Sequence, residues 1–193
     1  MKLQVLCVAY NRPIELMELC ICFLRQTNPN WELTIMYDGV VPKQISDIMG
    51  LFGDERIHFM HSPTRNGNYG HPNRKTMLEG LQCDSNDFVL MTNDDNVYVP
   101  IFVDVMLGAT ESAGVVMCNT LHSYTKYLPH ISELRECGID MGAFIVRADV
   151  AKSVGFNHIH FSADGKYAEE CGLYCKEKGL GIKHVQHLLF IHN

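Results

Sequence analysis

Two adjacent carboxylates, Asp94 and Asp95, stand at the centre of the stretch FVLMTNDDNVYVP, which covers residues 88 to 100. An apolar run ends just before them, and an asparagine lies on either side. Two like charges this close raise the cost of ionising both side chains unless a cation lies between them. Mg²⁺ and Mn²⁺ bind carboxylate and phosphate oxygens in one coordination shell. The pair therefore predicts part of a divalent metal site that a diphosphate ligand completes, with a solvated turn as the alternative.

Polar residues also follow two earlier apolar runs. The residues Tyr-Asn-Arg at 10–12 come after LQVLCVA, and Asp38 comes after ELTIMY. In an open parallel sheet, ligands bind at the carboxyl ends of the strands, so we expect these groups and the aspartate pair at one edge. Pro100, which favours the first turn of a helix, follows the pair too late for either aspartate to cap that helix.

The first hundred residues alternate between expected strands and helices. Continuous apolar runs predict the strands, and apolar residues at helical spacing after Pro13 predict the first helix. The expected strands are 3–9, 32–37, 56–60 and 87–92, and the expected helices are 13–24, 44–52 and 74–81. Glycine, asparagine and proline predict a loop over 62–72. This alternation predicts an α/β fold with a mainly parallel central sheet.

The second half of the chain is less regular. The expected elements are strands near 115–118, 142–146 and 182–191, a helix from Pro100, and helices at 149–154 and 166–178. Residues 120–138 have no clear pattern. No internal repeat or linker is evident, so the 193 residues are expected to form one domain with a substantial core.

Composition excludes several classes of protein. The net charge is −6 and the basic residues are scattered, which argues against a nucleic-acid-binding surface. No apolar run reaches the roughly 18 residues of a membrane span, and the N-terminus lacks the pattern of a signal peptide, so we expect a cytoplasmic protein. The eight cysteines lie mostly in apolar surroundings without CxxC pairs, which favours buried thiols over a zinc site.

Three motif absences exclude further classes of nucleotide-binding protein. Residues AYNRP stand where a nicotinamide dehydrogenase would carry GxGxxG, and the phosphate-binding motif GxxxxGK[ST] occurs nowhere in the chain. A glycine-rich basic loop, expected in a sugar-nucleotide-forming nucleotidyltransferase, is also missing after the first strand.

Four segments in order carry a resemblance to a known family. VLCVAYNRP…LRQTNPNWELTIMYDG, FVLMTNDDNVYVP, MGAFIVRADVAKSVGF and KEKGLGIKHVQHLLFIH resemble family 2-type glycosyltransferases with the GT-A fold, and are especially similar to the spore-coat polysaccharide glycosyltransferase type. The resemblance spans nearly the whole chain. It implies a GT-A nucleotide-diphospho-sugar transferase fold over 1–193, with a nucleotide-binding half at 1–99 and an acceptor and catalytic half at 100–193, as a single domain or one domain of a longer protein.

The resemblance also implies roles for particular residues. A uracil ring would donate to Asp38, Arg74 would reach the base or the diphosphate, and Asp94 and Asp95 would match the DXD-type metal motif, with Asp95 as the direct ligand. His192 falls at the family's C-terminal histidine, which contacts the metal or diphosphate. The base pocket would be lined by Ala9, Tyr10 and Arg12. Three of these residues also have a purely structural interpretation: Asp38 in a simple turn, Arg74 as a solvated helix residue, and His192 at a frayed chain end.

The catalytic base departs from the family pattern. An inverting transfer needs a carboxylate to take the proton of the acceptor hydroxyl. Ala168 stands where the family's aspartate is expected, so Glu169 is the first candidate after a shift of one residue. Asp164, at the expected helix start, and Glu170 are the competitors, although Asp164 could instead cap the helix and Glu170 could be solvated.

The sequence therefore predicts a glycosyltransferase that depends on Mn²⁺ or Mg²⁺. Its donor would be a nucleotide-diphosphate sugar, with a UDP-sugar favoured, and its acceptor a hydroxyl on a glycan or another molecule, as in polysaccharide biosynthesis. The alternative is a non-catalytic nucleotide-sugar-binding module of a larger glycosyltransferase. Neither hypothesis involves nucleic acid or a membrane span.

Overall fold

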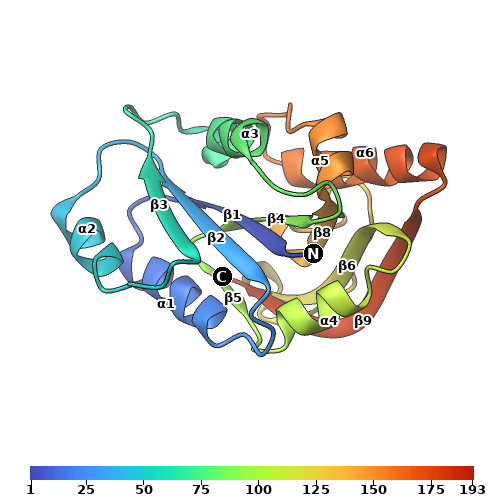
Figure 1. Cartoon of the computed structure of the whole chain (residues 1–193), viewed down its shortest axis with the longest axis horizontal. Coiled ribbons are helices and arrows are strands. Elements are labelled where there is room, and N and C mark those ends of the chain that lie inside the picture. The colour runs from blue at the N-terminus through green and yellow to red at the C-terminus, as the bar shows by residue number, and fades with distance from the viewer.

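The computed structural model describes residues 1–193. Helices cover both faces of one curved sheet, which gives the molecule three layers (Figure 1). The sheet has the strand order β3-β2-β1-β4-β8-β6-β9-β5, and β7 pairs with β6. In chain order the strands are β1 (Leu3–Ala9), β2 (Trp31–Tyr37), β3 (Ile57–His61), β4 (Phe88–Asn93), β5 (Asn96–Tyr98), β6 (Ala113–His122), β7 (Leu128–His130), β8 (Phe144–Arg147) and β9 (Gly181–His192).

Six α-helices cover the two faces of the sheet. One face carries α1 (Pro13–Leu24), α2 (Lys43–Met49) and α4 (Phe102–Gly108), and the other carries α3 (His71–Gly80), α5 (Ala148–Val154) and α6 (Ala163–Lys178) (Figure 1). Three short 3₁₀ helices are η1 (Asn68–Gly70), η2 (Ser123–Thr125) and η3 (Met141–Ala143). None of the helices has both the length and the apolar character needed to cross a bilayer.

Strand directions bring most strand ends to one edge. β1, β2, β3 and β4 are parallel to one another, and β6 is parallel to β9. β8 runs antiparallel to both β4 and β6, so β6 has the direction of β4. The carboxyl ends of β1, β2, β4, β6 and β9 therefore share one edge, as a ligand site in an α/β sheet requires. The predicted α/β fold with a mainly parallel sheet is confirmed.

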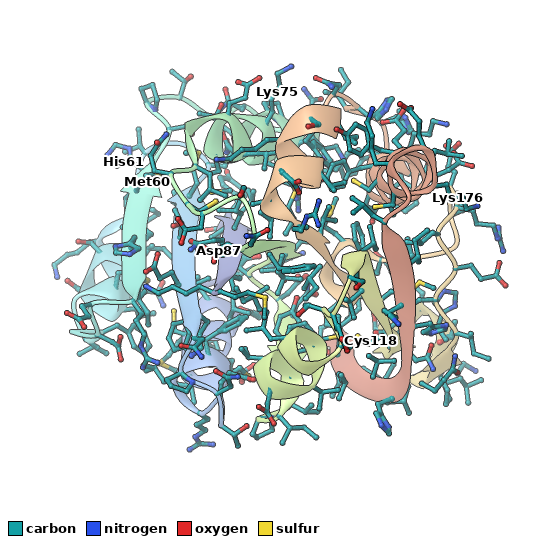
Figure 2. The ribbon with its side chains drawn as sticks, turned by 45° about the vertical axis from the view of Figure 1, so that its right-hand side comes forward. Met60, His61, Lys75, Asp87, Cys118 and Lys176 are labelled. Carbon is teal, nitrogen blue, oxygen red and sulfur yellow. The ribbon has the colours of Figure 1, made fainter.

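Burial on both faces explains the continuous apolar strands. All seven residues of β1 are buried, because α3 lies on one side of the central strands and α1 on the other. At the amino ends of the strands, Asp87 is a buried carboxylate with structural partners (Figure 2). Its Oδ1 accepts the backbone N–H of Lys2 at 2.7 Å, which fastens the start of β1 to the start of β4.

The structure differs from the sequence-based expectations mainly at element ends. Helices α3 and α6 begin three residues earlier than predicted, at His71 and Ala163. Helix α4 begins at Phe102 rather than at Pro100. There the Val103 N–H donates to the Gln26 side chain at 2.9 Å, so a distant residue fixes the helix start.

Two short strands had no counterpart in the prediction. β5 pairs with the end of β9, and β7 pairs with the end of β6. Each has only three residues, and its partner is distant in sequence or belongs to the unpatterned region 120–138. Hydrophobic periodicity does not report pairings of this kind.

The prediction of buried thiols holds for most of the cysteines. All eight are free, and five are buried: Cys7, Cys20, Cys118, Cys171 and Cys175. Figure 2 labels Cys118, and burial raises its pKa to about 12, so the thiol stays protonated. Cys22 and Cys83 are partly buried, and Cys137 is exposed.

Candidate active site

A cavity of about 1090 Å³ lies along the edge where the parallel strands end. It is lined by residues that directly follow or end β1, β2, β4, β6 and β9, together with the loop before α3 and the start of α6. Nine of the eleven predicted site residues line it: Ala9, Tyr10, Arg12, Asp38, Arg74, Asp94, Asp95, Asp164 and His192. Glu169 and Glu170 do not.

The aspartate pair forms the turn between β4 and β5. Asp94 and Asp95 are buried, with 3% and 9% of their surfaces exposed, so they are not a solvated turn. The guanidinium of Arg12 bridges them: its Nη1 lies 3.3 Å from Asp94 Oδ1 and also contacts Asp95 Oδ2. In the ligand-free protein, Arg12 therefore supplies the cation that two adjacent carboxylates require.

Burial gives these two carboxylates unusual proton affinities. It raises the pKa of Asp94 to about 7, against the opposing effect of the Tyr10 backbone N–H, which donates to Asp94 Oδ2 at 2.9 Å. Burial also raises the pKa of Asp95, although Arg12 and His192 act in the opposite direction. Asp95 Oδ1 is buried with no hydrogen-bond partner, which leaves it available to a ligand.

Asp38 holds the loop that closes one side of the cavity. Its Oδ1 accepts the Asn66 N–H at 2.8 Å and the Asn73 amide at 2.9 Å, and its Oδ2 accepts the Gly67 N–H at 2.9 Å. The side chain is 3% exposed, so it is more than a turn residue. Because Oδ2 accepts only one bond, it retains capacity for a second donor.

Arg65 and Tyr10 extend this side of the cavity. The guanidinium of Arg65 lies 4.0 Å from the centre of the Tyr10 ring, a cation–π contact, and Tyr10 in turn lies 5.9 Å from the Tyr37 ring. Arg65 lines the cavity but was not among the predicted residues. It lies in the predicted loop 62–72, where only the three-dimensional course of the chain shows which side chains turn inward.

Arg74 is a buried cation at the cavity wall, which rules out a solvated helix position. It is 2% exposed, and its Nη1 donates to the Tyr69 carbonyl at 2.7 Å and to His71 Nδ1 at 3.1 Å. Burial lowers the pKa of His71 to about 4, so His71 is neutral and can accept this bond. The other end of the guanidinium contacts Asn93, while Arg74 Nε has no partner.

The chain end at His192 is ordered by pairing on both sides of β9. His192 lies opposite Asn96 of β5 and opposite His122 of β6, and it is 8% exposed, so the frayed-end alternative is wrong. Its ring stacks on His122 at a centroid distance of 4.1 Å. Its Nε2 lies 3.4 Å from Asp140 Oδ2, and its Nδ1 is buried without a partner.

His122 and Asp140 are site residues that the sequence-based reasoning missed. His122 is the last residue of β6, and the strand-end rule would have found it had the strand not been predicted to end near residue 118. Asp140 caps η3 by accepting the Gly142 N–H at 3.0 Å, just before β8. No local pattern distinguishes it from an ordinary capping aspartate.

Of the candidate bases, the structure places Asp164 at the cavity. It is the second residue of α6 and accepts the Gly165 N–H at 3.0 Å; Ser162, not Asp164, occupies the N-cap position. Burial raises the pKa of Asp164, and the nearby Asp140 adds to this effect. Glu169 and Glu170 have partners outside the cavity: Glu169 pairs with Lys166 at 2.8 Å, and Glu170 contacts His158 Nε2 at 2.9 Å.

Two exposed aromatic rings line the same cavity as Asp164. Tyr69 is 64% exposed and Phe161 is 71% exposed, and the rings meet edge to face with centroids 5.8 Å apart. Phe161 lies three residues before Asp164. Large apolar side chains exposed at a cavity mark a surface for a ligand.

Comparisons with known proteins identify the fold. No family model and no curated protein sequence matches the chain. Solved structures do match. The structure of S. aureus TarS 1-349 has a TM-score of 0.75 and 15% identity, covering 100% of this chain and 60% of that one, and its complex with UDP has a TM-score of 0.79 and 13% identity, covering 99% and 60%. The mannosyltransferase PcManGT from Pyrobaculum calidifontis in complex with GDP-Man and Mn²⁺ has a TM-score of 0.72 and 12% identity, covering 99% and 56%.

The chain thus spans about 60% of the length of the TarS 1-349 structures that it matches. These matched proteins are glycosyltransferases with the GT-A fold. At such low identities the similarity establishes a common fold and does not extend to activity. This chain has the GT-A fold of glycosyltransferases.

Proposed function

We propose that this chain is a metal-dependent glycosyltransferase. It transfers a sugar from a nucleotide-diphosphate sugar, with a UDP-sugar as the favoured donor, to a hydroxyl of an acceptor. The observation that carries the proposal is the single cavity at the strand ends that collects nine of the eleven predicted site residues. The matched structures with UDP and with GDP-Man and Mn²⁺ support a nucleotide-sugar ligand in this fold. Our more specific proposal is that this enzyme is of the spore-coat polysaccharide glycosyltransferase type, which its sequence motifs resemble.

Cations and acceptors in the cavity fit a nucleoside diphosphate. The base would lie near Tyr10, Arg65 and Asp38, where an aromatic ring and a carboxylate oxygen with spare capacity are available. The diphosphate would lie near Arg12 and Arg74, because guanidinium groups match phosphate oxygens. In this arrangement Arg12 exchanges its aspartate partners for phosphate when the donor arrives.

The residues that we propose to hold a divalent cation beside the diphosphate are Asp94, Asp95 and His192, which line the same cavity. Asp95 Oδ1 and His192 Nδ1 are buried without partners, and carboxylate and imidazole are ligand types that Mn²⁺ accepts. Asp94 would contribute to the same site, as the DXD-type motif implies. When bound there, such an ion would supply positive charge that stabilises the leaving diphosphate. These residues would hold Mn²⁺ or Mg²⁺ through their unpartnered atoms.

Asp164 is our proposed catalytic base. As the acceptor oxygen forms its bond to the anomeric carbon, its proton passes to the Asp164 carboxylate while the bond from the sugar to the diphosphate breaks. A raised pKa makes a carboxylate a stronger base near neutral pH, and Asp164 has one because of its burial. Glu169 and Glu170 remain alternatives only if their contacts with Lys166 and His158 open.

A second candidate function is nucleotide-sugar binding without transfer. Ala168 is buried where the family's catalytic aspartate is expected, and the two glutamates beside it are paired elsewhere. In that case this chain would be a binding module of a larger glycosyltransferase, and the halves 1–99 and 100–193 would both serve to hold the donor.

Thermal unfolding with a panel of nucleotide sugars tests the proposal. A bound donor stabilises the folded state by mass action, so the correct sugar nucleotide should raise the melting temperature, more so with Mn²⁺. Asp95→Asn should lose most of this shift, whereas Asp47→Asn, on the exposed face of α2, should retain it. No shift with any nucleotide sugar, with or without Mn²⁺, would contradict the proposal. Transfer or hydrolysis of the selected donor would then exclude the binding-only alternative.

A further inference from the structure

Two exposed aromatic rings at the cavity lie outside the groups that we propose to hold the base, the diphosphate or a cation. Tyr69 and Phe161 meet edge to face with centroids 5.8 Å apart, and both line the cavity. Phe161 is the only exposed phenylalanine of the nine in the chain. A single exposed apolar side chain is common, whereas two aromatic rings in contact at a cavity indicate a surface for a ligand.

The backbone that carries Tyr69 is strained. Asn68 and Tyr69 have φ values of 47° and 57°, in the left-handed region that residues with a Cβ rarely occupy. Such conformations persist only where the surrounding structure enforces them, and they cluster at ligand sites. Here the Arg74 guanidinium donates to the Tyr69 carbonyl at 2.7 Å and holds the strained turn. The fold therefore maintains an unfavourable conformation at the residue that exposes its ring at the cavity.

The same buried arginine also fixes the segment that carries Phe161. Arg74 donates to His71 Nδ1 at 3.1 Å, so the neutral His71 ring has its proton on Nε2. That Nε2 donates to the carbonyl of His160, the residue before Phe161, at 3.1 Å. The His160 carbonyl also accepts the Ala163 N–H at 3.0 Å. Both aromatic residues are thus positioned before a ligand arrives, which reduces the entropy lost on binding.

The surroundings of the two rings fit a sugar better than a lipid. Ser162 and Asp164, which follow Phe161 in the sequence, also line the cavity, and only nine of its 29 lining residues are hydrophobic. A pyranose ring combines an apolar face of C–H groups with hydroxyls at its rim. The C–H groups match the negative π face of an aromatic ring, and the hydroxyls need polar partners nearby. An acyl chain would require a continuous apolar groove.

The position of Phe161 favours the acceptor over the donor sugar. In the proposed function the acceptor hydroxyl must reach Asp164, which lies three residues after Phe161 at the start of α6. The donor sugar is tied through its diphosphate to the side of the cavity formed by Arg12 and Asp95, after β1 and β4. A ring stacked on Phe161 is therefore better placed to present a hydroxyl to the base than to carry the diphosphate.

We propose that Tyr69 and Phe161 form an acceptor platform, on which a pyranose ring of a carbohydrate acceptor stacks with one hydroxyl directed at Asp164. The inference rests on the proposed function for the role of the bound sugar, and it adds the chemical class of the acceptor. Stacking on a fixed aromatic face orients the whole ring, so it selects which hydroxyl reaches the base. An open-chain polyol has no such face to stack.

Saturation-transfer-difference NMR of the full chain, without nucleotide, tests the inference. The probes are cellotetraose, maltotetraose, chitotetraose and mannotetraose, with ribitol as the open-chain comparison. At least one tetrasaccharide should bind, with the strongest saturation on the C–H protons of one ring face, and it should bind more tightly than ribitol. That pattern is expected of a stacked ring and not of hydroxyl contacts alone.

Substitutions at Phe161 separate stacking from simple apolar contact. Phe161→Leu keeps an apolar side chain but loses the flat face, and should weaken tetrasaccharide binding by about 3- to 10-fold. Phe161→Tyr keeps the face and should bind within about 2-fold of the wild type. Ile159→Ala is the matched control, because Ile159 is 62% exposed two residues earlier and does not line the cavity. It should bind as the wild type does.

Three results would overturn the inference: no tetrasaccharide binding by the wild type, ribitol bound as tightly as the best tetrasaccharide, or unchanged affinity in Phe161→Leu. Because Phe161 is exposed, its variants are expected to fold, and circular dichroism checks this. Failure of the proposed function gives a different pattern. A chain that binds a tetrasaccharide at Phe161 but no nucleotide sugar keeps the platform as a carbohydrate site and refutes the glycosyltransferase, whereas donor binding without any tetrasaccharide binding refutes the platform alone.

Discussion

Replacing Asp94 with asparagine should stabilise the ligand-free protein above neutral pH. The carboxylate is 3% exposed, and burial raises its pKa to about 7 from its ordinary value of 3.8. A group whose pKa is raised in the folded state contributes its stability below its unfolded pKa, and loses it as the pH rises through the folded pKa. Between about pH 4 and pH 7 the unfolded chain gives up the Asp94 proton while the folded protein keeps it, so the stability falls as the pH rises.

The pKa difference sets the size of this effect. At 1.36 kcal/mol for each pH unit, the change from 3.8 to about 7 corresponds to about 4 kcal/mol lost by pH 8. Asparagine has nearly the same shape, carries no charge, and can still accept the Tyr10 N–H, which donates to Asp94 Oδ2 at 2.9 Å. It gives up the attraction of Arg12, which is partly exposed, so the expected gain at pH 8 is about 2–4 kcal/mol.

Urea unfolding of the wild type and Asp94→Asn at several pH values measures this gain. The difference in unfolding free energy should grow by about 1.4 kcal/mol per pH unit from pH 5 to about pH 7 and then level off. Groups that do not interact with Asp94, such as His71, titrate equally in both proteins and cancel in the difference, whereas the adjacent Asp95 adds a smaller contribution of its own. Asp47→Asn, at an exposed ion pair with Lys43, should give a difference close to zero at every pH. A pH-independent difference between wild type and Asp94→Asn would refute the reasoning.

Two further predictions concern the cavity wall and the base. Gly70→Ala should lower the unfolding free energy by about 2–5 kcal/mol, because Gly70 has a φ of +77° and an added Cβ would lie 2.5 Å from a Val8 methyl. The control Gly179→Ala, at a φ of +68° with open space around it, should lower it by only about 1–2 kcal/mol. Equal losses in urea titrations would contradict the steric contribution at Gly70. Asp164→Asn should reduce the rate of sugar transfer by about 10²–10⁴-fold while the donor affinity is retained. Glu169→Gln should transfer sugar at the wild-type rate. The reverse pattern in a kinetic assay would identify Glu169 as the base.

The predicted part of the site came from one rule, that polar residues after parallel strands gather at one edge. The rule found Tyr10, Asp38 and the aspartate pair because the runs that precede them are mostly apolar and short. It missed His122 because the strand was predicted to end near residue 118, and residues 120–138 show no clear pattern. Those residues are held as a strand by pairing with β9, which sequence patterns do not report.

Long-range contacts also decided the roles that local reasoning left open. Arg12 was expected in the base pocket, and its bridge to Asp94 and Asp95 depends on the parallel register of β1 and β4. Asp164 could not be separated from Glu169 by spacing along the helix. Only the position of α6 against the sheet shows that the first turn faces the cavity, while the next turn does not.

Calorimetric titration with UDP at saturating Mn²⁺ tests most directly whether the cavity at the strand ends is a nucleotide-sugar site. Wild-type protein should bind one UDP per chain, and the affinity should fall by at least about 10-fold in Asp95→Asn, whose lost carboxylate oxygen is buried and free of protein partners. Binding of UDP with the same affinity in Asp95→Asn, or no binding of UDP or the donor that thermal screening selects, would contradict this assignment.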